Sequence, residues 1–202
     1  DRFKTMDDEK TIDLAFSGIL QNLNREADQT DIRVCIMRRL FHTWLDTPLL
    51  KKKAYWGTNI FWNSISRKKA GRYLSDVLGK RKRLDDKHYA ELIRKSKLYI
   101  NTLSPMGLVS PRFFECMASG TLVFCEESDL YQNIFPNHIY VTFRKDLSDF
   151  DEKLSYYLGA VQERGVIVEK AQTEVRGKHT WQKRVFDLLQ AIEKSAKEKA
   201  LV

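Results

Sequence analysis

The chain has 202 residues, of which 43% are hydrophobic and 31% charged, and its formal net charge is +8. These values exclude a disordered tail, and the 9 Gly and 4 Pro exclude a collagen-like or low-complexity chain. No uninterrupted apolar run reaches the roughly 18 residues that a membrane span needs. Because domains run to about 100–200 residues, the length predicts one domain over residues 1–202.

The cysteines indicate a reducing compartment, and we expect a cytoplasmic protein. Cys35, Cys116 and Cys125 are odd in number and far apart, so they predict neither a disulfide framework nor a zinc site. Residues 1–10 are charged and lack the apolar centre of a secretory signal. The chain does not begin with Met, so we expect it to be excised from a longer multidomain protein.

Strand and helix signals alternate along the chain. In chain order, the apolar spacing predicts a strand at 12–16, a helix with a stripe from Val34 to Trp44, a helix around Tyr89–Ile93, strands at 98–103, 121–125 and 139–143, a helix from Phe150 to Val161, and a last helix from Trp181 to Ile192 capped by Thr180. Such alternation is typical of an α/β fold with a mainly parallel sheet and helical crossovers. The mixed aromatic and basic segment from Lys51 to Arg83 supports no element assignment.

The segment from Ser110 to Glu126 contains the most informative pattern. Ser110 is a favoured N-cap residue, and Pro111 follows at the first helical position, where its missing N–H costs nothing. A helix that starts at the carboxyl end of a parallel strand favours bound anions. Arg112 adds a guanidinium group at that end, so the pattern indicates an anion site.

Glu115 lies one helical turn further on, where a carboxylate can accept the paired hydroxyl hydrogens of a ribose. Ala118, Ser119 and Gly120 are small, as is needed where a helix packs closely on a sheet and turns into the next strand. From the residues alone, a second interpretation is equally open. In it Ser110 only caps the helix, Arg112 is solvated, and the glutamate pairs with a nearby lysine.

Three consecutive segments resemble the donor-binding half of GT-B glycosyltransferases of the group 1 type, and especially the CgeB-like group. They are Tyr89–Asn101, Ser110–Gly120 and Thr121–Phe124. The likeness is strong from Tyr89 to Phe143 and continues into the last helix. It implies a Rossmann-like three-layer sandwich, one half of a GT-B fold.

The resemblance also assigns roles to residues. It implies that Glu115 binds the ribose hydroxyls of a nucleoside diphosphate-sugar, that Ser110 and Arg112 contact the diphosphate, and that Ser17 with Gly18 forms a second loop on the phosphate side. Many retaining GT-B enzymes carry a further glutamate eight positions before the ribose-binding one. Here Gly107 stands at that position, which leaves the stereochemical outcome open.

The function that the resemblance implies is transfer of a hexose or deoxyhexose to a glycan or lipid-linked acceptor, without a metal or cofactor and with a UDP-sugar as the favoured donor. In GT-B enzymes the acceptor pocket and the usual catalytic base belong largely to an N-terminal domain. This chain has room for one domain, so we expect a partner domain to complete the cleft. No residue is predicted to be the catalytic base.

Two acidic patterns are interpreted as helix starts. Asp149-Phe150-Asp151 matches the Asp-x-Asp pattern that binds a metal in GT-A glycosyltransferases, but here Ser148-Asp149 opens an amphipathic helix, so capping explains it. Asp85-Asp86 also precedes a helix. The four histidines lack metal-ligand spacing, and no metal site is predicted.

Three basic clusters, Lys51–Lys53, Arg67–Lys69 and Lys80–Arg83, account for much of the positive charge. Such runs usually form a solvated face. The alternative function is a non-catalytic α/β binding module that uses its basic 51–83 face on nucleic acid or on an anionic membrane. A peripheral contact with the cytoplasmic leaflet also suits an enzyme that acts on a lipid-linked acceptor.

Overall fold

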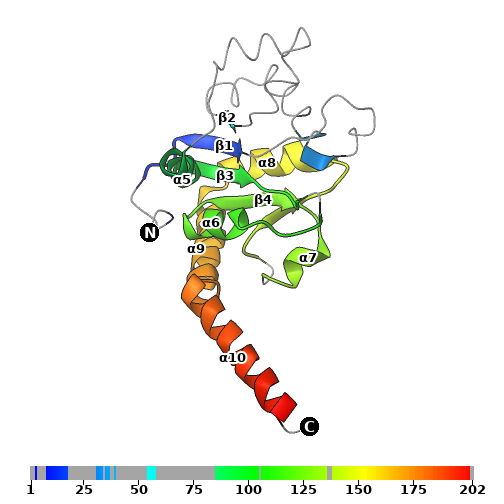
Figure 1. Ribbon diagram of the computed structural model, residues 1–202. Helices are drawn as coiled ribbons and strands as arrows, with labels where there is room; N and C mark the ends of the chain where they lie inside the picture. The colour runs from blue at the N-terminus through cyan, green and yellow to red at the C-terminus, as the bar shows by residue number, and fades with distance from the viewer. Residues whose placement is uncertain are drawn as a thin grey trace.

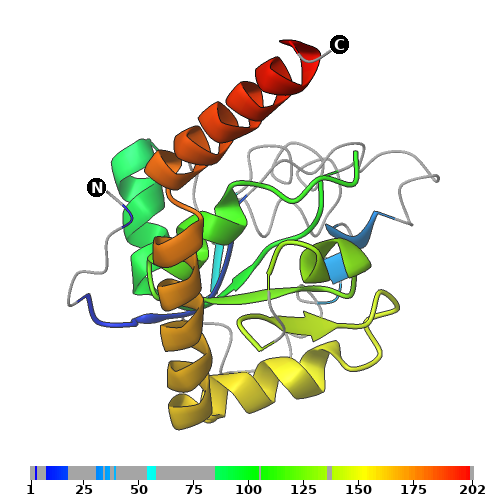
Figure 2. The same ribbon diagram turned by 90° about the horizontal axis from the view of Figure 1, so that it is seen from below.

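The computed structural model describes residues 3, 8–17, 31–33, 35–36, 39, 54–57, 85–104, 106–135 and 138–200. Within these residues, five strands form a parallel sheet with the order β2-β1-β3-β4-β5. The strands are β1 (Ile12–Ser17), β2 (Ala54–Gly57), β3 (Ser96–Ile100), β4 (Leu122–Glu126) and β5 (Val141–Phe143). Helices cover both faces of the sheet (Figures 1 and 2), which confirms the predicted α/β three-layer architecture.

The described helices are α5 (Asp86–Lys95), α6 (Arg112–Ala118), α7 (Asp129–Gln132), α8 (Phe150–Gly159), α9 (Val161–Lys178) and α10 (Trp181–Ala200). Side chains alternate between the two faces of each strand, so each face has its own apolar core. Leu98 and Phe124 point toward α8, and Tyr99 and Val123 point toward α5, α6 and α9. All four side chains are buried.

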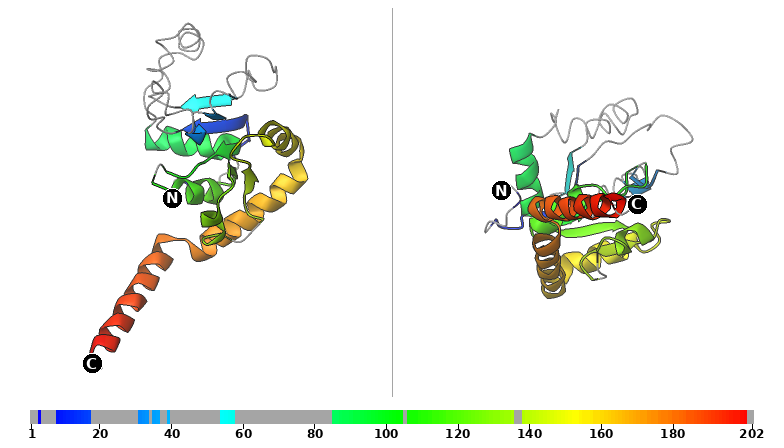
Figure 3. Two further views of the ribbon diagram at one scale, coloured as in Figure 1. Left: turned by 90° about the vertical axis from the view of Figure 1, so that its right-hand side faces the viewer. Right: turned by 60° about the horizontal axis from the view of Figure 1, so that its bottom comes forward.

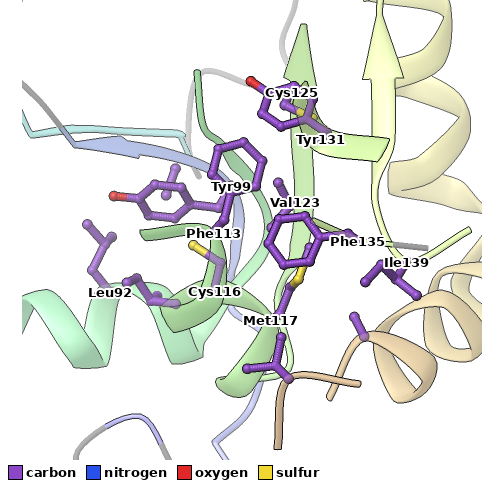
Figure 4. Packing of buried hydrophobic residues seen from close by; sticks show 14 residues of the cluster. Leu92, Tyr99, Phe113, Cys116, Met117, Val123, Cys125, Tyr131, Phe135 and Ile139 are labelled. Carbon is purple, nitrogen blue, oxygen red and sulfur yellow. The ribbon is translucent and has the colours of Figure 1, made fainter. Parts of the chain in front are cut away.

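Helix α6 packs on the sheet through side chains with little or no polar character. Phe113, Cys116 and Met117 face Val123 of β4 and the ring of Phe135 (Figure 4). Burial raises the pKa of the Cys116 thiol, so this cysteine stays protonated and acts as a small apolar group. Cys116 is therefore part of the apolar packing between α6 and the sheet.

The turn that follows α6 explains the run of small residues. The N–H of Thr121 donates to the carbonyl of Cys116 at 3.0 Å, and the N–H of Gly120 donates to that of Met117 at 3.2 Å. This pair of bonds is a Schellman motif, in which the residue after the C-cap takes a left-handed conformation. Gly120 has a φ of 71°, which a glycine adopts without strain.

Three predicted boundaries were wrong, and in each case a hydrogen bond or a backbone angle explains the difference. Strand β3 ends at Ile100 because the N–H of Leu103 donates to a side chain, the Oε1 of Glu126, at 2.9 Å. Strand β5 begins at Val141 because His138 has a φ of 81°, which is not extended. The apolar stripe from Phe150 to Val161 belongs to two helices, since Ala160 between them has non-helical dihedral angles.

The last helix begins where it was predicted. The side chain of Thr180 accepts a hydrogen bond from the N–H of Lys183 at 3.2 Å, which confirms the cap. Helix α10 projects away from the sheet (Figures 1 and 3). Its apolar stripe is exposed in the chain as described: Trp181, Val185, Phe186, Leu188, Leu189 and Ile192.

Several predictions fall outside the described residues. They concern Gly18, the apolar stripe from Val34 to Trp44, and the three basic clusters between Lys51 and Arg83. In the described part of the chain, no helix is both long enough and apolar enough to cross a membrane.

Candidate functional site

The candidate site lies at the carboxyl edge of the sheet, where the strands end and two helices begin. Ser17 is the last residue of β1, and Asn101 directly follows β3. Helices α5 and α6 lead into strands β3 and β4, so their first turns lie at this same edge. Tyr89 and Glu115 each occupy the first turn of their helix, which brings two distant parts of the sequence together.

A tyrosine hydroxyl links the two charged residues that the sequence singled out. The hydroxyl of Tyr89 donates to Oε2 of Glu115 at 2.7 Å. The Nε of Arg112 donates to the same hydroxyl at 3.0 Å, and its guanidinium carbon lies 5.8 Å from the tyrosine ring centroid. Burial raises the pKa of the phenol, so it keeps its proton and donates it to the carboxylate at neutral pH.

Several polar atoms of Arg112 and Glu115 remain available to bind a ligand. Among the described residues, the two terminal nitrogens of Arg112 and the Oε1 of Glu115 make no hydrogen bond. Both side chains are half-buried, so each keeps a polar end near solvent. Terminal guanidinium nitrogens bind phosphate oxygens bidentately, and a carboxylate oxygen accepts from sugar hydroxyls.

Ser17 joins the same neighbourhood through a second tyrosine. Its hydroxyl is hydrogen-bonded to the hydroxyl of Tyr99, and both residues are buried. Burial raises the pKa of Tyr99, and the positive charge of Arg112 opposes this rise. The structure therefore brings Ser17, Arg112 and Glu115 to one edge.

Ser110 does not cap α6, which corrects the prediction. The helix begins at Arg112, its N-cap is Pro111 with helical dihedral angles, and no side chain caps it. The hydroxyl of Ser110 donates instead to Oδ1 of Asn101 at 3.3 Å. Asn101 is buried, and its Nδ2 has no hydrogen-bond partner among the described residues.

The loop before α6 depends on a glycine. Gly107 has a φ of 71° and is exposed, and its N–H donates to the carbonyl of Ser104 at 2.9 Å. A left-handed backbone is strained for a residue with a Cβ, so glutamate would destabilise this turn. Gly107, which stands where many retaining GT-B enzymes carry a glutamate, therefore allows this loop conformation.

Glu126 holds the other end of this loop. Its Oε1 accepts from Leu103, whereas its Oε2 is buried without a hydrogen-bond partner among the described residues. The buried Tyr131 hydroxyl lies beside this carboxyl group. Burial raises the pKa of Glu126, and the N–H of Leu103 opposes the rise. The charged form of this carboxyl group therefore destabilises the folded state.

We expect Glu126→Gln to raise the melting temperature at pH 7, because the amide is neutral and keeps the acceptor for Leu103. The pKa of Glu126 is higher in the folded state than its ordinary value of 4.5. The protonated group therefore stabilises the folded state fully below pH 4.5, and this stabilisation is lost as the pH rises through the folded pKa. The advantage of the variant should therefore be full above the raised folded pKa and shrink as the pH falls through that value towards 4.5. Thermal unfolding from pH 4 to 8 measures it, with exposed Glu127→Gln as control. An equal shift at every pH would contradict the assignment.

The acidic pattern at 149–151 is occupied by the protein's own cations and backbone. The carboxylate of Asp149 accepts from Lys153 at 2.7 Å and from the N–H of Arg144 at 2.8 Å. Asp151 pairs with Arg39 at 2.5 Å. Asp85 caps α5 by accepting from the N–H of His88. The described residues contain no group of three or more His, Cys, Asp or Glu side chains placed to hold a metal.

The sequence did not single out Tyr89, Tyr99 or Asn101 as site residues. Tyr89 was counted in an apolar helical stripe, and Tyr99 in a strand. The available signal was chemical, since a buried tyrosine hydroxyl or asparagine amide requires a polar partner. Their partners come from other elements, so only the fold could identify them.

The parallel sheet and the polar residues at its carboxyl edge define a Rossmann-like α/β domain. The chain belongs to the glycosyl transferase-like family, which it matches over residues 33–190. No protein of known, curated function matches its sequence.

Solved structures show the same fold at low sequence identity. The C-terminal domain of a glycosyl transferase group 1 family protein (LpcC) from Francisella tularensis is 13% identical with a TM-score of 0.59, over 89% of this chain and 96% of that one. The GtfA/B complex is 11% identical with a TM-score of 0.61, over 95% of this chain and 37% of that one. S. aureus TarM is 12% identical with a TM-score of 0.55, over 93% of this chain and 36% of that one. The chain thus has the fold of one half of a GT-B glycosyltransferase and spans 37% and 36% of the latter two chains.

Proposed function

We propose that this chain is the donor-binding domain of a GT-B glycosyltransferase and binds a nucleoside diphosphate-sugar at the carboxyl edge of its sheet. The observation that carries the proposal is the placement of Arg112 and Glu115 on one helical turn, each with polar atoms that make no hydrogen bond among the described residues. Family membership supports the reaction class. A UDP-sugar is the favoured donor, and TarM was crystallised with UDP.

Each residue has a defined task in this proposal. The terminal nitrogens of Arg112 neutralise the diphosphate leaving group, where charge develops during glycosyl transfer. The Oε1 of Glu115 accepts from the ribose hydroxyls and fixes the nucleoside. The hydroxyl of Ser110 turns from Asn101 to a phosphate oxygen, and Ser17 with Gly18 borders the phosphate side.

The transferred hexose or deoxyhexose and its glycan or lipid-linked acceptor then meet in a cleft that a second domain completes. The extra length of TarM and of the GtfA/B chain relative to this one supports that expectation. No metal and no cofactor is required in the proposal, because Arg112 supplies the positive charge at the diphosphate. In the proposal the protein lies in the cytoplasm, and a peripheral contact with the membrane surface would bring the site close to a lipid-linked acceptor.

A thermal-shift screen with UDP, GDP and deoxythymidine diphosphate tests the proposal. A ligand that binds only the folded state at 100 times its Kd stabilises it by about 2.7 kcal/mol. For a chain of this size each kcal/mol raises the melting temperature by about 2–4 °C. We expect one of the three nucleotides to give a shift of that order, and uridine none. The absence of a shift with all three would contradict donor binding.

A further inference from the structure

The hydroxyl of Tyr89 separates two opposite charges that would otherwise meet. Arg112 and Glu115 are three residues apart on α6, a spacing at which side chains on one helix face are neighbours and form ion pairs. They form no direct ion pair in the structure. The guanidinium donates through Nε to the phenol oxygen, and the phenol donates to Oε2 of the carboxylate.

This arrangement divides each charged group into an engaged and a free part. Among the described residues, the tyrosine occupies the Nε of Arg112 and the Oε2 of Glu115, and the terminal nitrogens and Oε1 remain unengaged. A direct ion pair would instead consume the terminal nitrogens and a carboxylate oxygen. The free atoms are those that the proposed function assigns to the diphosphate and the ribose.

Tyr89 is itself held in place from several directions. It lies on α5, with its ring partly buried against the core shared by α5, α6 and the sheet. The ring of Phe3 meets it edge-on, with the ring centroids 6.1 Å apart. Packing therefore orients the ring that carries the hydroxyl.

We propose that Tyr89 is a positioning residue of the donor site, which keeps Arg112 and Glu115 apart so that both can bind the nucleotide. The nucleotide in this proposal rests on the proposed function. The separation of Arg112 from Glu115 by Tyr89 can be tested without any ligand. Without the hydroxyl, the arginine and the glutamate close into a direct ion pair, and the nucleotide must break that pair in order to bind.

The variant Tyr89→Phe removes only the hydroxyl and retains the packed ring. A crystal structure of the ligand-free variant should show a terminal nitrogen of Arg112 within 4 Å of the Glu115 carboxylate. Unchanged positions of both side chains would overturn the separating role, whether or not the wild-type protein binds a nucleotide.

Titration with UDP tests the functional half. We expect Tyr89→Phe to weaken UDP binding about tenfold, the loss typical of one hydrogen bond to a charged group. In a Glu115→Gln background the same change should have little further effect, because no ion pair can form. Tyr157→Phe, on the opposite face of the sheet, should bind as wild type. Equal losses in both backgrounds, or no loss, would overturn the proposal, and failure of the wild type to bind would instead contradict the proposed function.

Discussion

Replacing Glu115 by alanine should weaken nucleoside diphosphate binding by about 10–100-fold, because hydrogen bonds to charged groups contribute about 1.5–3 kcal/mol each. The carboxylate is half-buried and is oriented by a hydrogen bond from the Tyr89 hydroxyl at 2.7 Å. The loss should appear in the Kd measured by calorimetric titration of wild type and variant with UDP.

The same substitution at Glu152 provides the control. This residue is exposed in the first turn of α8, which packs on the opposite face of the sheet. Its alanine variant should bind UDP with the wild-type affinity. An unchanged affinity in Glu115→Ala would show that the ribose lies elsewhere, and would contradict the site as described.

The largest effect on stability is expected from Phe124→Ala. Phe124 is fully buried in β4, and its ring centroid lies 4.8 Å from that of Phe143 and 5.2 Å from that of Phe150. It therefore joins two strands and α8 in one core. Removing a buried Phe side chain costs about 3–5 kcal/mol of unfolding free energy, as lost transfer energy and a residual cavity.

Urea denaturation measures this loss, with Phe186→Ala as the matched control. Phe186 lies on α10 with 53% of its surface exposed. Surface substitutions usually change stability by less than about 0.5 kcal/mol. Similar losses in the two variants would mean that Phe186 is buried in solution, or that Phe124 is not.

The repeating elements were predictable because their signals are local. Strands β1 and β4 and helices α5 and α10 follow from apolar periodicity and from caps such as Asp85 and Thr180, which lie next to what they cap. The parallel sheet then follows from the alternation of strands and helices. The end of β3 was not predictable in this way, because a distant residue, Glu126, accepts the hydrogen bond from the N–H of Leu103.

The site was predictable in part for the same reason. Arg112 and Glu115 belong to one short segment whose pattern resembles a known family. Tyr89 lies 26 positions before Glu115 in the sequence, and its hydroxyl reaches the carboxylate only because α5 and α6 pack side by side. Ser110 was assigned a cap that it does not form, because its competing partner, Asn101, follows a different element.

Calorimetric titration of the wild-type chain with UDP is the most direct test of nucleoside diphosphate binding through Arg112 and Glu115. We predict saturable binding at one site per chain, with no detectable binding of uridine, which lacks the diphosphate. Absence of saturable binding of UDP, GDP and deoxythymidine diphosphate, together with salt-sensitive binding to DNA or anionic liposomes, would rule out this site and favour the non-catalytic alternative.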